Sequence, residues 1–193
     1  MKEKILLPPI KEDNLAKLLK ERRSYRNYKE ESLNKEELSY LSWAAYGKSK
    51  SFRTIPSAGA LFPLSLYIVI NNVKNLGKGI YRYEQDHSLI KFSDKDIIEE
   101  LARASFHQLF ITSASLIMII SASFKKTTSC YGERGLRYVF IEVGHMGQNI
   151  YLAATNLGLG TVAIGAFDDE EVKRILKIDE EPLYLMPVGR IND

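Results

Sequence analysis

The chain has 193 residues, of which 45% are hydrophobic and 26% charged, and its formal net charge is +3. This size and composition fit one soluble globular domain that can bury a full core. The net charge is too small to indicate nucleic-acid binding by itself, because nucleic-acid-binding domains usually concentrate far more positive charge. The single cysteine, Cys130, cannot form a disulfide within the chain, so we expect a reducing compartment, the cytoplasm. The apolar runs are too short for a signal peptide or a membrane span, so we expect no membrane partner.

The N-terminal part of the sequence predicts an arm followed by two helices. Residues 1–13 read as an extended arm, and residues 14–193 as a single domain that begins with a short helix over residues 14–21. Asn34 and Glu37 have the spacing of a capping box, which predicts the start of a second helix. Residues 48–62 read as a loop with small residues around Pro56, which would let a ligand approach the backbone closely.

The rest of the chain interleaves strands and helices without a regular βαβ repeat. The expected strands are residues 64–70, 79–83, 88–92, 114–122, 161–165 and 183–188. The expected helices are one opening at Ser93, a long one over residues 136–157 and one over residues 168–176, while residues 123–135 read as a polar connection. This order predicts an α+β sandwich, in which a sheet is packed by helices.

The segment from Arg22 to Arg26 is the first candidate for a binding site. It contains three arginines and Ser24 within five residues. Guanidinium forks match phosphate oxygens bidentately, and a serine hydroxyl adds a donor. Alone, the segment also fits a solvated basic patch, the edge of a nucleic-acid surface or a membrane surface. Together with the small-residue loop and residues 161–165, it could build a pocket for a phosphorylated flat ring.

Other candidate sites are less consistent with their context. Gly158 and Gly160 follow a helix and precede a strand, which is the reverse of a dinucleotide-binding fingerprint. Glu142 and His145 have half of the spacing of a di-metal site, but no second Glu-x-x-His occurs, so no metal site is expected. Cys130 has no identifiable histidine and acid as its base, which favours an ordinary free thiol.

With these segments in view, the chain resembles the FMN-dependent nitroreductase family, and within it the SagB-type dehydrogenase branch. The resemblance covers essentially the whole chain after residue 14, and no single motif carries it alone. The matching segments, in the family's order, run from Arg22 to Arg26, from Pro56 to Leu64, from Tyr131 to Gly135, from Glu142 to Asn149 with Gly158 to Gly160, from Gly165 to Asp169 and from Pro187 to Gly189.

The resemblance implies an α+β flavoprotein with a central, mostly antiparallel sheet, working as a homodimer with FMN at the interface. The family's phosphate and ribityl contacts match Arg22, Arg23, Ser24 and Arg26. The loop that a partner protomer lays against the flavin ring matches Pro56, Ser57, Ala58, Gly59 and Ala60. The strand end beside the redox edge of the ring matches Ile164, Gly165 and Ala166. Gln108 is a further match for the ring and Arg190 for the phosphate.

The implied chemistry is ping-pong electron transfer from NAD(P)H through the flavin to a small nitro, quinone or related acceptor. SagB-type azoline oxidases carry a Lys-Tyr pair where this chain has Cys130 and Tyr131, so the lysine base is missing and Tyr131 is the remaining candidate for proton transfer. A general oxidoreductase is therefore favoured. The alternatives are a dehydrogenase of a peptide-derived azoline or similar substrate, a flavin-binding partner subunit with little activity, and a nucleic-acid binder using Lys125 and Lys126 with the arginine segment.

Overall fold

Six strands form one sheet in the order β5-β4-β3-β6-β8-β7, and every neighbouring pair is antiparallel. The computed structural model describes residues 4–191. The strands are β3 (Leu64–Ile70), β4 (Gly79–Tyr83), β5 (Leu89–Ser93), β6 (Leu116–Ala122), β7 (Leu159–Thr161) and β8 (Glu181–Arg190). This arrangement confirms the predicted sheet, with its two most apolar strands, β3 and β6, at the centre.

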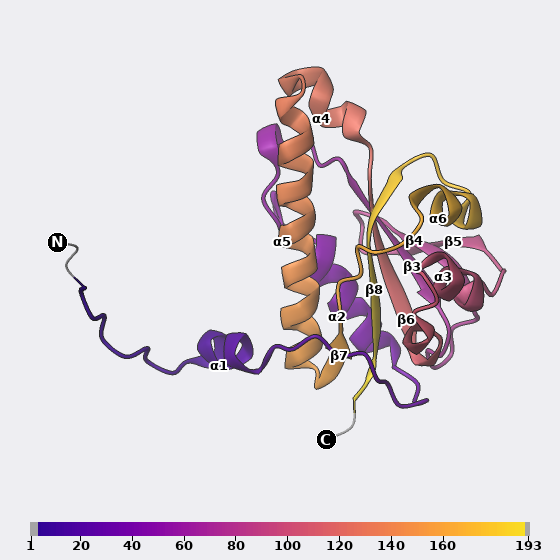
Figure 1. Cartoon of the computed structure of the whole chain (residues 1–193), viewed down its shortest axis with the longest axis horizontal. Coiled ribbons are helices and arrows are strands. Elements are labelled where there is room, and N and C mark those ends of the chain that lie inside the picture. Colours follow the sequence, from indigo (N-terminus) through magenta and orange to yellow (C-terminus); the bar gives the residue numbers. More distant parts are fainter. Residues whose placement is uncertain (1–3, 192–193) are drawn as a thin grey trace.

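Helices cover both faces of this sheet, which confirms the predicted α+β sandwich (Figure 1). Helix α2 and the long helix α5 lie on one face, and α3 and α6 on the other. The helices are α1 (Asn14–Glu21), α2 (Lys35–Tyr46), α3 (Ile98–Ala104), α4 (Phe124–Tyr131), α5 (Arg134–Asn156) and α6 (Asp169–Leu176). Among residues 4–191, none of the helices combines the length and the hydrophobicity that a membrane-spanning segment needs.

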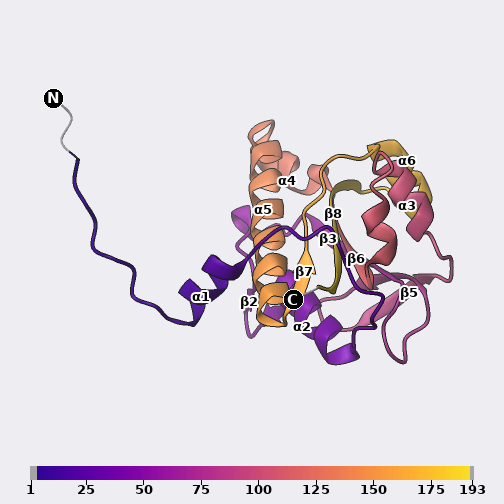
Figure 2. The same ribbon diagram turned by 60° about the horizontal axis from the view of Figure 1, so that its bottom comes forward.

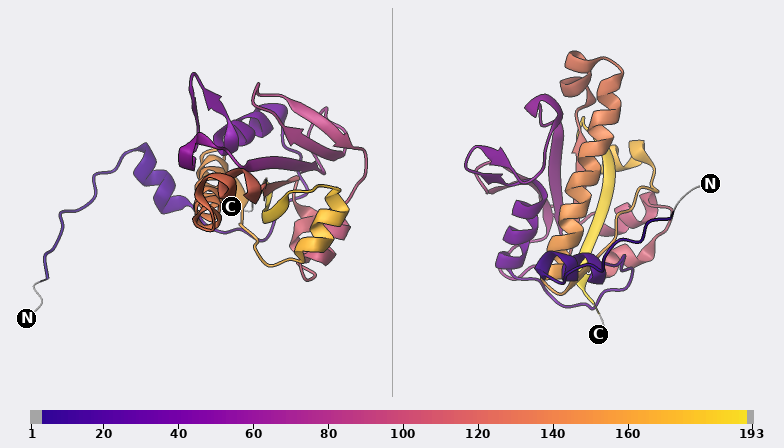
Figure 3. Two further views of the ribbon diagram at one scale, coloured as in Figure 1. Left: turned by 90° about the horizontal axis from the view of Figure 1, so that it is seen from above. Right: turned by 90° about the vertical axis from the view of Figure 1, so that its left-hand side faces the viewer.

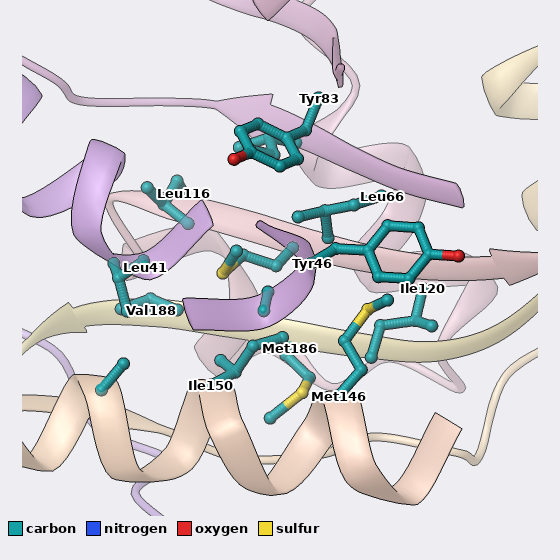
Figure 4. Packing of buried hydrophobic residues seen from close by; sticks show 14 of the residues in the cluster. Leu41, Tyr46, Leu66, Tyr83, Leu116, Ile120, Met146, Ile150, Met186 and Val188 are labelled. Carbon is teal, nitrogen blue, oxygen red and sulfur yellow. The ribbon is translucent and has the colours of Figure 1, made fainter. Parts of the chain in front are cut away.

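The alternation of side chains along the central strands builds two hydrophobic cores. Leu66 and Ile68 of β3 face α2 and α5, whereas Tyr67 and Val69 face α3 and α6. Because successive strand residues point to opposite faces, a strand buried on both sides reads as a continuous apolar run. The close-up in Figure 4 shows Met146 of α5 pointing toward the sheet in the first core.

The N-terminal arm runs away from the domain (Figures 1 and 2). Residues 4–13 are exposed and have no regular secondary structure, and α1 buries none of its residues. Both views of Figure 3 show α1 beside the end of α5. The arm nevertheless carries apolar side chains, including Ile5, Leu7 and Ile10, each more than 70% exposed. Residues 1–3 of the predicted arm and residues 192–193 of the predicted domain lie outside the described residues.

Several local expectations differ from the structure. The polar connection predicted over residues 123–135 is wrong, because Phe124–Tyr131 forms helix α4 and packs on the start of α5. The strand predicted over residues 161–165 is displaced: β7 is Leu159–Thr161, and only Ile164 makes an isolated bridge farther on. Residues 48–62 contain a small two-stranded pair, β1 (Lys48–Ser49) with β2 (Phe52–Arg53). The predicted capping box is confirmed, with both Asn34–Glu37 hydrogen bonds at 2.8 Å.

Candidate functional site

The arginine segment lies against the C-terminal half of α5. Arg22 ends α1, and its guanidinium carbon stands 5.2 Å from the centre of the Tyr151 ring. The Ser24 hydroxyl lies 2.9 Å from the Tyr151 hydroxyl. The guanidinium of Arg23 donates to the carbonyl oxygens of Lys20 and Arg22. The guanidinium of Arg22 and the hydroxyl of Ser24 both contact Tyr151, and these two contacts hold the start of the segment on α5.

The same segment also borders the strand end that follows β7. The backbone N–H of Tyr25 donates to the Thr161 carbonyl at 3.0 Å, which forms a bridge between Ser24 and Thr161. The close approach requires glycine at position 160, since a Cβ there would lie 2.8 Å from the Cβ of Tyr25. The fold therefore brings together the arginine segment and the strand end after β7, two predicted site segments that are far apart in the chain.

Beyond β7, some backbone N–H groups have hydrogen-bond partners within the described residues and others do not. The N–H of Ala163 donates to the Tyr151 hydroxyl at 2.8 Å, and Ile164 exchanges backbone hydrogen bonds with Leu185. Among residues 4–191, no partner is found for the N–H groups of Gly165 and Ala166. Two adjacent unpaired donors at a strand end suit an acceptor-rich ligand edge.

Gln108 and Arg190, the two further predicted residues, have different surroundings. The Gln108 side-chain amide donates to the Ala166 carbonyl at 3.1 Å, so Gln108 lies at the strand end. Arg190 makes a double contact with Glu37, with nitrogen–oxygen distances of 2.7 and 2.9 Å. Its guanidinium is thus engaged within the chain, whereas Arg22, Arg23 and Arg26 form no ion pair within the described residues.

The predicted ring loop lies elsewhere, beside Tyr131. Ala58–Ala60 forms a short 3-10 turn, and Gly59, Ala60 and Phe62 have positive φ angles of 59°, 53° and 46°. A Cβ on Gly59 would stand 2.7 Å from the Tyr131 hydroxyl, so the loop and this tyrosine are in close contact. The structure thus joins the loop to the predicted proton-transfer residue and leaves both away from the arginine segment.

Helix α5 separates the two halves of the predicted site. The loop lies on the side of α5 that carries Glu142, whose pKa is raised by burial and only partly lowered again by Ser57, whereas the arginine segment contacts Tyr151. Tyr151 lies about two and a half turns after Glu142, which puts the two side chains on opposite sides of the helix and about 14 Å apart along it. One chain by itself therefore does not bring this loop to the arginines.

Glu142 is the most perturbed carboxyl near the loop. Its side chain is 3% exposed, and burial raises its pKa to about 7, opposed by the Ser57 hydroxyl and the Arg53 guanidinium. His145, which has metal-site spacing to Glu142 in the sequence, is exposed instead, so these two side chains do not share one environment.

Tyr151, which connects the arginine segment to the strand end, is not among the residues that the sequence singles out. A tyrosine at the edge of an apolar helix stripe is an ordinary packing residue, so its sequence position carries no distinct signal. The contact of Glu37 with Arg190 was also missed, because it joins residues at opposite ends of the chain.

Comparison with known proteins gives the family. The model of the nitroreductase family matches residues 19–190. A Methanocaldococcus jannaschii protein, provisionally named a nitroreductase, is 48% identical over 189 residues, which cover 96% of both chains. A crystal structure from Anabaena variabilis with a similar provisional name has a TM-score of 0.82 and 29% identity, covering 93% of this chain and 38% of that one. The microcin B17-processing protein McbC of Escherichia coli is 26% identical over 152 residues, covering 73% of this chain and 55% of that protein. The chain therefore belongs to the nitroreductase family and is an oxidoreductase.

Proposed function

We propose that this protein is a cytoplasmic FMN-dependent oxidoreductase that passes electrons from NAD(P)H to a small nitro, quinone or related acceptor. The observation that carries the proposal is the group of arginines without ion-pair partners beside the strand end with unpaired N–H groups. Guanidiniums that no carboxylate neutralises are available to an anionic ligand. Family membership supports the same assignment.

The residues present fit FMN in two respects. Arg22, Ser24 and Arg26 offer the donors that a terminal phosphate requires, and Arg23 flanks them. The N–H groups of Gly165 and Ala166 suit the polar edge of the ring, where they would stabilise negative charge. Bound FMN supplies the two-electron chemistry, while the chain binds the phosphate, orients the ring and limits access of water.

The proposal includes a homodimer, in which the loop around Ser57 from one protomer meets the ring held by its partner. Within one chain the loop and the arginine segment lie on opposite sides of α5, so a second copy would complete the pocket. Leu136, Phe140 and Ile141 of α5 are between 42% and 56% exposed, which offers an apolar surface for such a partner.

The visible spectrum of the purified protein tests this function. We expect flavin absorbance after expression or after reconstitution with FMN, bleaching under anaerobic NADH or NADPH, and recovery when a quinone is added. A colourless protein that takes up no FMN would refute the proposal. Bound FMN that neither nucleotide reduces would instead indicate a partner subunit with little activity of its own.

A dehydrogenase of a peptide-derived azoline or similar substrate is the second candidate. The contact between the Tyr131 hydroxyl and Gly59 of the ring loop favours it, as does the similarity to the microcin-processing protein. In this case Tyr131→Phe should abolish substrate oxidation and leave flavin binding intact. Unchanged turnover would remove Tyr131 from proton transfer.

A further inference from the structure

The segment of residues 104–110, at the end of α3 and just beyond it, contains two consecutive residues with a left-handed backbone. Phe106 has a φ of 53° and His107 a φ of 59°. Residues other than glycine rarely adopt this conformation, which persists only where the surrounding structure enforces it and which occurs often at functional sites. The contacts that hold this strained segment in place therefore bear on what it does.

Two hydrogen bonds hold the segment against the strand end that is proposed to meet the flavin ring. The backbone N–H of Asp168 donates to the Ala104 carbonyl at 2.9 Å, and the Gln108 side chain donates to the Ala166 carbonyl at 3.1 Å. Phe106 and its neighbour lie between these two anchors in the chain. The strained backbone is therefore fixed beside the strand end.

The C-terminal end of the segment is connected to the arginine segment. The ring of Phe110 packs against that of Tyr28, with centroids 6.5 Å apart, and the Tyr28 hydroxyl donates to the Tyr25 carbonyl at 2.7 Å. Tyr25 belongs to the arginine segment, which is proposed to bind the phosphate of FMN. Residues 104–110 are thus tied to both segments of the proposed flavin site.

Two large apolar side chains of this segment are exposed. Phe106 and Leu109 are each 66% exposed, and neither belongs to the two hydrophobic cores of the described residues. An exposed apolar side chain on a strained backbone contributes little to the stability of the chain by itself. At the edge of a binding site, the same side chain removes apolar surface of a ligand from water.

We propose that Phe106, together with Leu109, is a specificity-determining residue that offers an apolar face to the electron acceptor, and that the preferred acceptors are flat, fused-ring molecules rather than single-ring or aliphatic ones. This inference rests on the proposed function. Contact between two aromatic rings stabilises a complex beyond the apolar area that it buries, so a fused-ring acceptor gains more from Phe106 than a single ring does. The left-handed backbone is then retained for this contact, although it lowers the stability of the fold.

The test compares naphthoquinone, with two fused rings, and benzoquinone, with one ring, as acceptors for the FMN-loaded protein. NAD(P)H supplies a hydride and solvent a proton, and each quinone becomes its hydroquinone. Phe106→Ala should lower the ratio of kcat/KM for naphthoquinone to kcat/KM for benzoquinone roughly 2- to 12-fold relative to wild type. Because each variant is compared with wild type on the same two quinones, their different potentials cancel. Phe106→Tyr should keep most of the ratio, and the control Phe92→Ala, at an exposed phenylalanine of the edge strand β5, should leave it unchanged.

Urea unfolding of the cofactor-free protein gives a second readout. Glycine adopts a positive φ without strain, so Phe106→Gly should raise the urea midpoint while it lowers the quinone ratio as Phe106→Ala does. If Phe106→Gly lowers the midpoint, Phe106 serves the fold and the proposal is overturned. An unchanged ratio in Phe106→Ala, in protein that binds FMN and is reduced by NAD(P)H, also overturns it and leaves the proposed function standing. A wild-type protein that takes up no FMN would refute the proposed function, and this inference with it.

Discussion

The hydroxyl groups of Ser24 and Tyr151 lie 2.9 Å apart although the residues are separated by 127 positions in the chain. The Tyr151 hydroxyl also accepts the Ala163 N–H at 2.8 Å. One side chain of α5 thus ties the arginine segment to the strand end, and the proposed phosphate and ring contacts are held at a fixed separation. Preorganisation of this kind lowers the ordering cost of ligand binding.

Tyr151→Phe should weaken FMN binding by roughly 5- to 150-fold, because it removes two hydrogen bonds that each contribute about 0.5–1.5 kcal/mol. The Arg22 guanidinium would keep an aromatic ring beneath it, so the variant should still fold. Fluorescence titration of FMN measures the effect, and Tyr40→Phe, at an exposed tyrosine of α2, is the control. Equal affinities of the two variants would show that Tyr151 does not organise the site.

The arginines should account for most of the affinity for the phosphate. Arg22→Ala combined with Arg26→Ala should weaken FMN binding by at least about 100-fold, since hydrogen bonds to charged groups contribute about 1.5–3 kcal/mol each. The matched control is Arg103→Ala with Arg174→Ala, two cations on the helices of the opposite sheet face. Riboflavin, which lacks the phosphate, should bind the double variant and wild type alike. Full FMN occupancy in the Arg22 and Arg26 variant would reject the assignment.

Gly59 and Tyr131 should interact energetically. Gly59→Ala places a Cβ at positive φ and 2.7 Å from the Tyr131 hydroxyl, so we expect a loss of about 1–2 kcal/mol in the free energy of unfolding. Tyr131→Phe removes the oxygen that the new Cβ meets and should recover part of that loss in the double variant. Urea unfolding of the two single variants and the double variant measures the coupling. If the two changes in the free energy of unfolding are strictly additive, the loop moves away from Tyr131 in Gly59→Ala.

The parts of the fold that the sequence predicted depend on local signals. The capping box at Asn34, the apolar run of β3 and the apolar stripe of α5 are each visible within a short window. Helix α4 was missed because Thr127, Thr128 and Ser129 are poor helix formers, and its stability comes from packing on α5. Likewise, β7 is defined by its pairing with Arg190 and its neighbours in β8, a partner far away in sequence.

The candidate site divides in the same way. The arginine segment and the loop around Ser57 could be singled out from residue types and from the family resemblance. The contacts that hold the arginine segment in place could not, because Tyr151 meets Ser24 and Ala163 only in the folded chain. The sequence also could not show which arginines form ion pairs. Arg190 pairs with Glu37, whereas Arg22 forms no ion pair within the described residues.

Glu142 should make the stability of the protein depend on pH. Burial raises its pKa from 4.5 to about 7, so the folded state binds a proton that the unfolded state has already released between these values. The stabilisation is therefore fully present below pH 4.5 and is lost as the pH rises to about 7, by at most about 3 kcal/mol. Glu142→Gln has no proton to lose, so its free energy of unfolding relative to wild type should be higher at pH 8 than at pH 5. Urea unfolding at both pH values measures this difference, with Glu36→Gln as the exposed control. Parallel pH profiles of wild type and Glu142→Gln would mean that Glu142 is already ionised at pH 5 in the folded protein.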